Sequence, residues 1–440
     1  MIRKLVLGSF AWLALHLPAA QGALVDYGVV PLVSSDSSVG APMHDETLIG
    51  GWGIAIRPAE RGTGGHFWLS SFGNGTSNQY VGDVGGVPLF QDALVNMDAP
   101  PFPTGFVPPN PSGPESPIPD GGGIARMTGQ TWQQTPGLIT SLPHVNGVIT
   151  GPAKFLFATE DGVISAWTDN KQPDGTPNWV GYSATQIDRS AEGSRFYGIT
   201  VSNLSGQLYT ADRGATPGVK VFSGDFAEVA TALDAFNPFA GADGVQPGEF
   251  AALNVQTAKI NGDGNLFVTY SQAVADASNP SLIAAGIGAV GAGLGRIAEY
   301  TPSGELVAVW DDRGLLNAPY GLAFSPHDFG LASDMLLIGN AGDGSIVAFD
   351  PDTRTAVDYL RDAEGDVIHI DGLKGLVFGN GISLGEANAL YFAAGPDGGS
   401  NGLFGKVVSV PEPSTLALGA VLLALLQMGR ATRARRSFST

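Results

Sequence analysis

A short motif that occurs six times constrains the fold of this chain more than any other feature. Each copy has one variable residue, then a position that is usually glycine, then small or branched apolar residues. The copies begin at Trp52, Asn146, Tyr197, Leu253, Tyr320 and Lys374. A fixed pattern of this kind indicates six similar structural units.

Strands and tight turns make up these units. A second apolar strand is expected after each motif, at residues 67–70, 155–159, 207–211, 266–270, 335–339 and 390–394. Hairpins follow around Asp161-Gly162 and Asp343-Gly344, because an Asp-Gly pair accepts the positive φ angles of a two-residue turn. Repeated meanders without helical patterns predict an all-β, six-bladed β-propeller, in which each small sheet buries its faces against its neighbours around a ring.

The two ends of the repeat region predict how the ring closes. An apolar strand at residues 29–33 precedes the first unit, and the last unit ends at residues 404–410 without a fourth strand of its own. We therefore expect the N-terminal strand to complete the last blade, within a propeller domain of residues 23–408. The alternative is a seven-bladed ring, with an extra blade formed by degenerate strands between residues 79 and 134.

Two insertions interrupt the pattern. Residues 98–123 hold nine prolines, so this segment is expected to be an exposed, extended loop. Residues 274–293 are rich in Ala and Gly and are expected to form a short helix or a mobile flap. Long loops on a rigid ring are frequent binding elements, and they are also places where insertion costs little.

Composition limits the partners of the chain. Only 14% of the residues are charged, the formal net charge is −19, and there is no cysteine. A body this acidic repels nucleic acid and anionic lipid head groups. Without disulfides, its own core must hold the fold.

The N-terminus has the anatomy of a secretory signal peptide. Arg3 and Lys4 precede an apolar stretch at residues 5–17, and Ala20 and Gly22 supply small residues for a cleavage site. Residues 1–22 are therefore expected to direct export.

The C-terminus combines a proline-bounded motif, an apolar run at residues 416–428 and a basic end. The motif is Pro411, Glu412, Pro413, Ser414 and Thr415, and the basic residues are Arg430, Arg433, Arg435 and Arg436. Lipid accommodates the apolar run, and the arginines stay on the cytoplasmic side. A helical run of this length spans only about 20 Å, less than the roughly 30 Å of a hydrocarbon core. It suits a temporary anchor, although the residues alone also fit an ordinary anchor helix.

This tail resembles the PEP-CTERM sorting signal of Gram-negative bacteria over residues 409–440. The resemblance implies a transient stay in the inner membrane, an exosortase as partner through the tail, and delivery to the envelope or the extracellular matrix.

The body resembles an uncharacterised bacterial family of exported propellers that often carry such tails. The resemblance lies in residues 157–167, 291–295, 317–323, 339–344 and 402–405. It implies a six-bladed fold similar to NHL-repeat propellers, and it brings no established activity and no catalytic residues.

The residue before each glycine position should lie at one mouth of the central channel. The aromatic, amide and ammonium groups of Trp52, Asn146, Tyr197, Leu253, Tyr320 and Lys374 would then surround this mouth. Such groups stack on sugar rings and bind their hydroxyls, which predicts a carbohydrate ligand. The same aromatics could instead plug the channel.

Motifs for metal and nucleophilic chemistry are weak. Acidic and amide residues resemble Ca²⁺ loops at Asp161, Asp263, Asp343, Asn261, Asn265 and Asn340, but they lack the spaced pattern that ends in a bidentate glutamate. Turn formation explains them better. Lactonase-type propellers hold a divalent metal with Glu, Asp and Asn in the channel, and the sixfold positions supply only Asn146. The histidines are scattered, and no serine elbow is present.

These features together predict a monomeric binding or scaffold module without enzymatic activity, with exopolysaccharide as its candidate ligand. The alternative is a propeller enzyme, either a metal-dependent lactonase-like hydrolase or a quinone-dependent dehydrogenase. We predict no cofactor and no metal site, and Ca²⁺ is the ion that the acidic excess leaves open.

Overall fold

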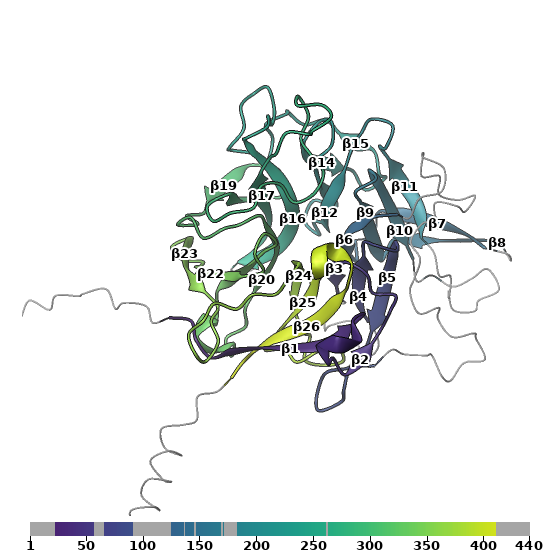
Figure 1. Cartoon of the computed structure of the whole chain (residues 1–440). Coiled ribbons are helices and arrows are strands. Elements are labelled where there is room, and N and C mark those ends of the chain that lie inside the picture. Colours follow the sequence, from purple (N-terminus) through teal and green to yellow (C-terminus); the bar gives the residue numbers. More distant parts are fainter. Residues whose placement is uncertain are drawn as a thin grey trace, which may run out of the picture.

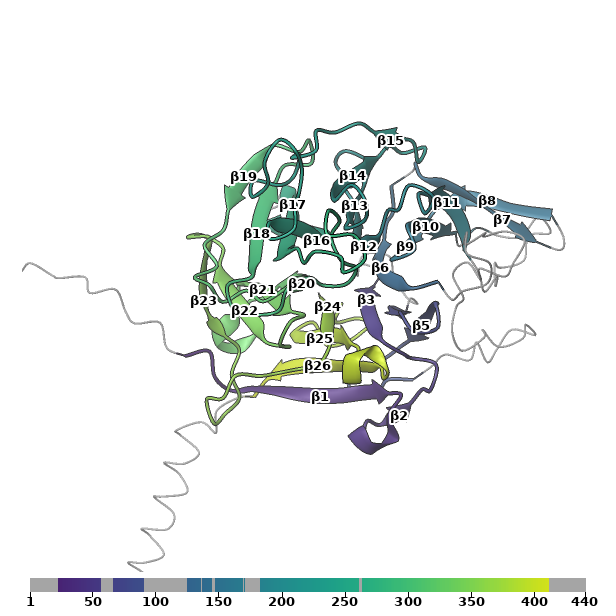
Figure 2. The same cartoon turned by 45° about the horizontal axis from the view of Figure 1, so that its top comes forward.

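In the computed structural model the chain forms a ring of six β-sheets around a central channel (Figures 1 and 2). The structure describes residues 23–410, apart from residues 57–65, 91–124, 136, 145–146, 169, 171–182 and 261–262. Neighbouring innermost strands touch in the cyclic order β3, β6, β12, β16, β20, β24 and back to β3. The prediction of a six-bladed propeller is confirmed.

Each blade is an antiparallel meander whose first strand lies innermost. The first three blades are β3 (Gly51–Ala55), β4 (Phe67–Ser71) and β5 (Thr76–Tyr80); β6 (Met127–Trp132), β9 (Phe155–Thr159), β10 (Val163–Trp167) and β11 (Ala184–Asp188); and β12 (Phe196–Val201), β13 (Leu208–Asp212), β14 (Gly218–Phe222) and β15 (Glu228–Val229). The next two are β16 (Phe250–Ile260), β17 (Asp263–Gln272), β18 (Gly295–Tyr300) and β19 (Leu306–Val309); and β20 (Pro319–Phe324), β21 (Leu336–Asn340), β22 (Ile346–Asp350) and β23 (Thr355–Tyr359). All six expected second strands are confirmed.

The sixth blade joins the two ends of the described chain. It contains β24 (Leu373–Phe378), β25 (Ala389–Ala394), β26 (Leu403–Ser409), β1 (Tyr27–Ser34) and the short parallel strand β2 (Met43–His44). Strand β1 pairs antiparallel with β26, from Tyr27 opposite Ser409 to Ser34 opposite Leu403. Figure 2 shows the two strands side by side at the rim. The predicted closure is therefore confirmed, and the seven-bladed alternative is wrong.

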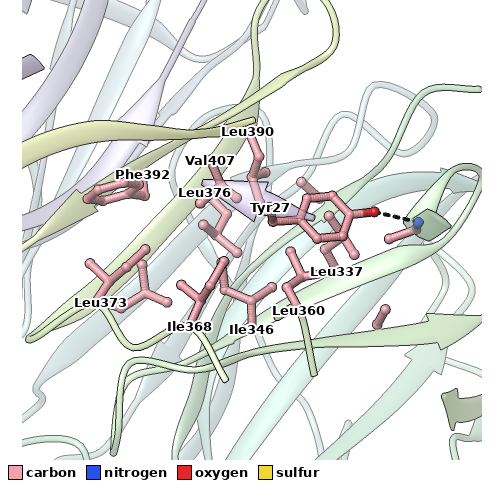
Figure 3. Close-up of a cluster of buried hydrophobic side chains, with 14 of the residues drawn as sticks. Tyr27, Leu337, Ile346, Leu360, Ile368, Leu373, Leu376, Leu390, Phe392 and Val407 are labelled. Atoms are coloured by element: carbon pink, nitrogen blue, oxygen red, sulfur yellow. Dashed lines mark hydrogen bonds between the residues drawn. The ribbon is translucent and has the colours of Figure 1, made fainter. Parts of the chain in front are cut away.

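The closing strand is held by a core between the fifth and sixth blades (Figure 3). Tyr27 packs there with apolar side chains of both blades, among them Leu337, Leu360 and Leu390. Its hydroxyl donates to the carbonyl of Phe329 at 2.9 Å and accepts from the amide of Ala332 at 2.6 Å, in the short 3₁₀ turn η3 (Gly330–Ala332). Closure thus buries apolar area and also satisfies the one polar atom of that side chain.

The recurring glycine has a steric cause. A Cβ on Gly129 of β6 would overlap the carbonyl oxygen of Tyr197 on β12, and one on Gly375 would lie 2.8 Å from the carbonyl oxygen of Trp52. In five of the six blades the innermost strand thus approaches its neighbour too closely for a side chain at this position. The fourth blade has Asn254 there instead, and its amide donates to the carbonyl of Tyr320 on the next strand at 2.8 Å.

The second blade corrects one sequence prediction. The motif at Asn146 lies in a hairpin of β7 (Ile139–His144) and β8 (Gly147–Pro152), which pair only with each other and project from the blade. Asn146 itself is outside the described residues. The innermost strand is β6, which pairs with β9, so Thr128 takes the place predicted for Asn146. The hairpin has the motif's apolar run, whereas β6 has polar residues after its glycine.

The two insertions differ in what the structure tells about them. Residues 98–123 lie outside the described residues. Residues 274–293 connect β17 to β18 and contain no helix, so the short-helix alternative is wrong, and the flap alternative stays a prediction. Their only regular pairing is a bridge between Ala275 and Ile283. The described residues contain two further 3₁₀ turns, η1 (Ser37–Val39) and η4 (Asp397–Gly399).

Candidate functional site

The innermost strands begin at one mouth of the channel, which we call the upper mouth. Five of the six residues predicted for it are there, and Thr128 replaces Asn146 as the sixth. The aromatic members contact one another: the Trp52 ring lies 5.9 Å from the ring of Tyr197 and 5.9 Å from that of Tyr320. Leu253 packs into the same cluster. The predicted gathering of these side chains is therefore present, whereas ligand binding by them stays a prediction.

These side chains fill the channel. Tyr197 and Leu253 are fully buried, and Tyr320 is 3% exposed. The Tyr320 hydroxyl donates to the carbonyl of Thr128 at 2.5 Å, across the channel axis from its own blade. Because both rings are buried and pack against the Trp52 ring, the tyrosines present no free face to a sugar. Any ligand at the upper mouth must be recognised by other groups.

A cavity of about 390 Å³ lies above this aromatic layer. Its polar lining combines the ammonium of Lys374 with the carboxyl groups of Glu160, Asp343 and Asp371. Glycine-rich loops of four blades form much of the rest, so backbone N–H and C=O groups are accessible there. Phe72 and Ile287, both half-buried, add apolar surface.

Lys374 is the most constrained of these groups. The residue is 8% exposed, and its ammonium donates to the carbonyl of Gly372 at 3.2 Å. The Nζ atom also lies 5.0 Å from the centroid of the Trp52 ring, in a cation–π contact. Burial lowers the pKa of Lys374 to about 8, against the opposing charge of Asp371. A lysine with hydrogen-bonding capacity to spare therefore faces the cavity, held by a ring beneath it.

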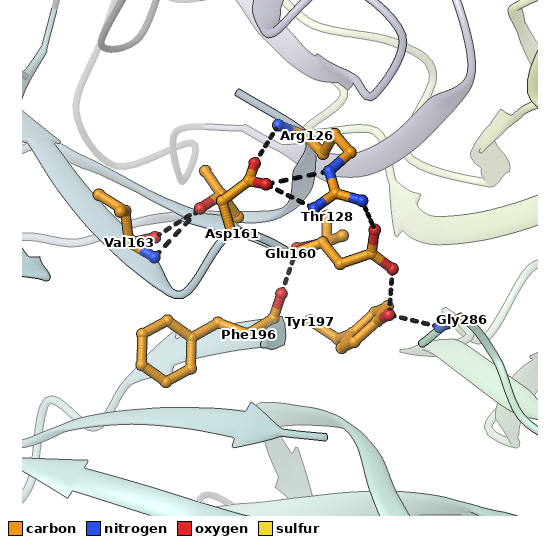
Figure 4. A network of polar contacts seen from close by, with 9 residues as sticks. Arg126, Thr128, Glu160, Asp161, Val163, Phe196, Tyr197 and Gly286 are labelled. Carbon is orange, nitrogen blue, oxygen red and sulfur yellow. Dashed lines mark hydrogen bonds and ion pairs between the residues drawn. The ribbon is translucent and has the colours of Figure 1, made fainter. Parts of the chain in front are cut away.

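A polar network fixes one wall of the cavity (Figure 4). Arg126 pairs with Glu160 at 2.7 Å and with Asp161 at 2.6 Å. The Tyr197 hydroxyl donates to the other oxygen of Glu160 and accepts from the amide of Gly286 at 2.6 Å. Burial and the adjacent Glu160 raise the pKa of Tyr197, so its hydroxyl stays protonated. The network links the second and third blades to the β17–β18 connection.

Asp343 and Asp371 lie in the loops on the opposite wall. One oxygen of Asp343 accepts from the amide and hydroxyl of Ser345, and the other accepts from the amide of Asn317 at 2.9 Å. Asp371 accepts from the amide of Asp397 at 2.9 Å. Both residues are exposed, so their remaining lone pairs can reach a ligand.

The acidic and amide residues considered for Ca²⁺ are dispersed. Asp161 pairs with Arg126, and the amide of Asn265 donates to Glu299 at 2.7 Å. The amide of Asn340 donates to Ser345, while Asn261 is outside the described residues. Across the described parts of residues 23–410, no three His, Asp or Glu side chains are grouped so as to hold a metal ion.

A second, smaller cavity lies on the other side of the aromatic layer, at what we call the lower mouth. It has a volume of about 170 Å³. Its polar lining consists of amides and hydroxyls, namely Gln130, Thr131, Thr200, Asn254, Gln256 and Thr257. The lining residues in the described structure carry no formal charge, in contrast to those of the upper mouth.

Sequence reasoning missed several residues of the upper mouth. Arg126, Glu160 and Phe72 belong to no repeated motif, although Glu160 directly precedes the predicted Asp161-Gly162 turn. A signal was nevertheless available, because the turns between second and third strands lie at the same end of each blade as the starts of the innermost strands. Polar residues in those turns could have been assigned to this mouth.

The sorting elements cannot be placed on the fold, because residues 1–22 and 411–440 lie outside the described residues. Within the part that is described, no helix is long and apolar enough to cross a membrane.

Comparison with known proteins gives distant relatives. No family model matches the chain. Uncharacterized protein R648 of Acanthamoeba polyphaga mimivirus is 28% identical over 264 residues, which are 60% of this chain and 59% of that protein. Uncharacterized protein R640 of the same virus is 28% identical over 53% of this chain and 39% of its own length. The chain thus spans about two to three fifths of the length of these relatives.

Among solved structures, an α-L-arabinofuranosidase of Fusarium graminearum is similar at 11% identity and a TM-score of 0.42, over 82% of this chain and 93% of that one. A putative oxidoreductase (glucose dehydrogenase) of Thermus thermophilus is similar at 11% identity and a TM-score of 0.38, over 86% of this chain and 99% of that one. Likenesses this weak say nothing about what the chain binds or catalyses.

Proposed function

We propose that this protein is an exported binding module that holds a hydroxyl-rich ligand, a sugar unit of an extracellular polysaccharide, in the cavity of the upper mouth. One observation carries the proposal: a cavity of about 390 Å³ brings a nearly buried ammonium together with three carboxyl groups. This volume lies within the range of small-ligand sites, roughly 300 to 1,000 Å³.

The chemistry of the lining favours a polyhydroxylated ligand. A sugar hydroxyl both donates and accepts, so carboxylates of Asp343 and Asp371 can accept from it and the ammonium of Lys374 can donate to it. The half-buried Phe72 and Ile287 offer apolar surface for the C–H face of a ring. The net charge of −19 disfavours an anionic polymer.

The route to that ligand is part of the proposal and rests on the sequence. Residues 1–22 would direct export across the inner membrane. The motif at residues 411–415, the apolar run and the terminal arginines would present the protein to an exosortase before release toward the envelope or matrix. We propose that the released protein acts as a monomer.

The enzymatic alternatives have less support. A metal-dependent hydrolase needs a group of metal ligands, which the described residues do not supply. No observation at the upper mouth favours a quinone, so a quinone-dependent dehydrogenase is not proposed.

Calorimetric titration of the purified protein with a panel of neutral mono- and oligosaccharides tests the proposal. The informative variant is Lys374→Gln, because alanine at Trp52 or Tyr320 would remove part of the channel filling and confuse binding with folding. Loss of a hydrogen bond from a charged donor costs about 1.5 to 3 kcal/mol, so we expect affinity to fall about 10- to 100-fold.

Lys154→Gln is the matched control, since Lys154 is half-buried at the start of β9 and does not line this cavity. Its affinity should equal that of the unmodified protein. Absence of binding to every sugar, or equal affinity of Lys374→Gln and the unmodified protein, would contradict the proposal.

A further inference from the structure

Lys374 places an amine beside open space in the interior of the ring. The residue belongs to β24, the innermost strand of the sixth blade, and it is 8% exposed. Its side chain lines the cavity of about 390 Å³ at the upper mouth. A small ligand in this cavity can therefore contact the side chain.

Few contacts occupy the Nζ atom of Lys374. It donates to the carbonyl of Gly372 at 3.2 Å and lies 5.0 Å from the centroid of the Trp52 ring. The ion pairs between described residues do not include it. The charge of Asp371, which lines the same cavity, acts on it without such a pair. In its neutral form this amine keeps its lone pair free for a ligand.

The environment increases the neutral fraction of this amine. Burial lowers the pKa of Lys374 to about 8. At pH 7 about one amine in ten is then neutral, compared with about one in 3,000 for a lysine with the ordinary pKa of 10.5, a difference of about 300-fold. A desolvated, neutral lysine is a nucleophile that forms Schiff bases with carbonyl groups. Lys374 therefore has covalent chemistry available besides hydrogen bonding.

We propose that Lys374 captures a small hydroxyaldehyde in this cavity as a reversible imine, and that the open-chain end of a reducing sugar is the ligand of this class. The amine nitrogen bonds to the aldehyde carbon while one of its protons moves to the carbonyl oxygen. The C–O bond then breaks, and the oxygen leaves as water with the second proton of the nitrogen. The step consumes no oxidant and no reductant.

Asp371 is the carboxylate best placed to assist this step. Among the described residues it accepts only from the amide of Asp397, at 2.9 Å, so one of its oxygens is left to relay protons between the nitrogen and the departing oxygen. Glu160, by contrast, is engaged through both oxygens, by Arg126 and by Tyr197. The negative charge of Asp371 also favours the protonated imine.

The inference rests on the proposed function for the identity of the ligand, but not for the reaction of the amine. Glycolaldehyde, the smallest hydroxyaldehyde, needs only the amine and the space in front of it, so it probes the reaction without the contacts that would hold a sugar. Methyl glycosides have no free aldehyde, so they probe those contacts without the reaction. The two probes separate a failure of this inference from a failure of the proposed function.

Reductive trapping of the purified protein tests the inference. The protein is incubated at pH 7 with glycolaldehyde and sodium cyanoborohydride, which converts each imine into a stable secondary amine, and the rate at each lysine is followed by mass spectrometry of peptides. Lys220 of β14 is the matched control, because it lines another cavity, of about 380 Å³, but is half-buried. We expect labelling at Lys374 to be about tenfold faster, since the lower basicity of its amine offsets part of the gain in neutral fraction.

The pH dependence identifies the group that reacts. The other titratable groups that line the cavity or lie beneath Lys374 are those of Glu160, Asp343, Asp371, Tyr197 and Tyr320. Burial raises the pKa of both tyrosines, so neither loses its proton between pH 7 and 10. The amine of Lys374 is almost fully neutral above pH 9, whereas that of an ordinary lysine still gains neutral fraction there. The ratio of the rates at Lys374 and Lys220 should therefore fall at least about tenfold from pH 7 to pH 10, and taking this ratio cancels the pH dependence of the reductant.

Labelling of Lys374 that is no faster than that of Lys220 at pH 7, or a ratio that does not fall with pH, would overturn the inference. Because the unmodified protein is used throughout, no variant has to fold. Calorimetry with methyl glycosides decides the proposed function separately: their binding without a preferred adduct at Lys374 would leave the sugar site and remove the imine, and a preferred adduct without their binding would do the reverse.

Discussion

The upper and lower mouths of the channel are built by the same six strands and have different chemistry. At the upper mouth, charged groups of Lys374, Asp343 and Asp371 face a cavity of about 390 Å³. At the lower mouth, amide groups face about 170 Å³ and bond between blades: Gln256 donates to the carbonyl of Leu322 at 2.7 Å, and Gln130 to that of Gly53 at 3.1 Å.

The contrast separates two uses of polar residues in one ring. Lower-mouth amides are occupied by the carbonyls of a neighbouring innermost strand, so they hold the ring together. The charged groups at the upper mouth come mostly from loops. Some of their lone pairs and N–H donors are not hydrogen-bonded within the protein, so they are available to bind a ligand. Four substitutions test this division, from the largest expected effect to the smallest.

The largest effect is expected where both mouths depend on the same close approach of strands. In Gly129→Ala the new methyl group overlaps the carbonyl of Tyr197, and the strands must separate. Overpacking against rigid backbone should cost about 3 kcal/mol of the free energy of unfolding, the upper end of the usual range, measured by urea denaturation. Gly241→Ala is the control, because a Cβ there meets nothing within 4 Å, and its midpoint should hardly move. Equal stability of the two variants would refute the steric account of the glycine motif.

The next effect tests the charge at the upper mouth. The folded-state pKa of Lys374 is about 8 and the ordinary pKa of a lysine is 10.5, so between these pH values the unfolded chain holds a proton that the folded chain has released. The contribution of Lys374 to the free energy of unfolding therefore rises with pH across this window, by up to about 3 kcal/mol.

Lys374→Met should remove that contribution. Urea denaturation at intervals from pH 7 to 10.5 measures it as the difference between the unmodified protein and the variant, which cancels other titrating groups. Lys154→Met should follow the unmodified protein. If the difference in free energy of unfolding between the unmodified protein and Lys374→Met stays constant with pH, Lys374 is not desolvated.

A smaller effect is expected for the network beside the cavity. Tyr197→Phe removes the hydroxyl that joins Glu160 to the amide of Gly286, leaving the buried carboxylate and the half-buried amide each short of a partner. The expected loss is about 1 to 3 kcal/mol in urea denaturation. Tyr359→Phe, which loses one half-buried bond to the carbonyl of Leu315, should lose less than about 1 kcal/mol. A larger loss of stability in Tyr359→Phe than in Tyr197→Phe would show that this network does not stabilise the wall of the upper cavity.

The smallest effect belongs to the lower mouth. Gln256→Ala loses one bond between blades, for which we expect about 0.5 to 1.5 kcal/mol of stability and no change in sugar affinity. Calorimetry and urea denaturation on the same sample check both. A sugar affinity that drops with Gln256→Ala but not with Lys374→Gln would exchange the roles of the two mouths.

The sequence predicted the ring because the cause of its repeat is local. A glycine stands at this close approach in five of the six blades, as at Gly375, and this leaves a visible period. Asn146 was misassigned because the hairpin of β7 and β8 carries the apolar signature, while the true strand at Thr128 carries polar residues. A repeated sequence motif reflects only which residue types recur. It carries no information about which strand pairs with β9.

The site itself was only partly predictable. Lys374 was identified because it occupies a repeat position. Glu160 depends on a contact between blades, with Tyr197. Such partners are far apart in sequence, so no local pattern could have joined them. The β17–β18 connection gave no periodic signal either, because its contacts with the third blade are made by single residues such as Gly286.

The pairing of β1 with β26 has a consequence for biosynthesis. Strand β1 leaves the ribosome first among the described elements, and its partner leaves last. At roughly 5 to 20 residues per second, β1 waits for on the order of tens of seconds before the ring can close. During that wait its backbone edge and the ring of Tyr27 have no place to pack. The order of synthesis therefore makes closure the final, whole-chain step of folding, and a factor that shields β1 meanwhile would raise the yield of closed rings.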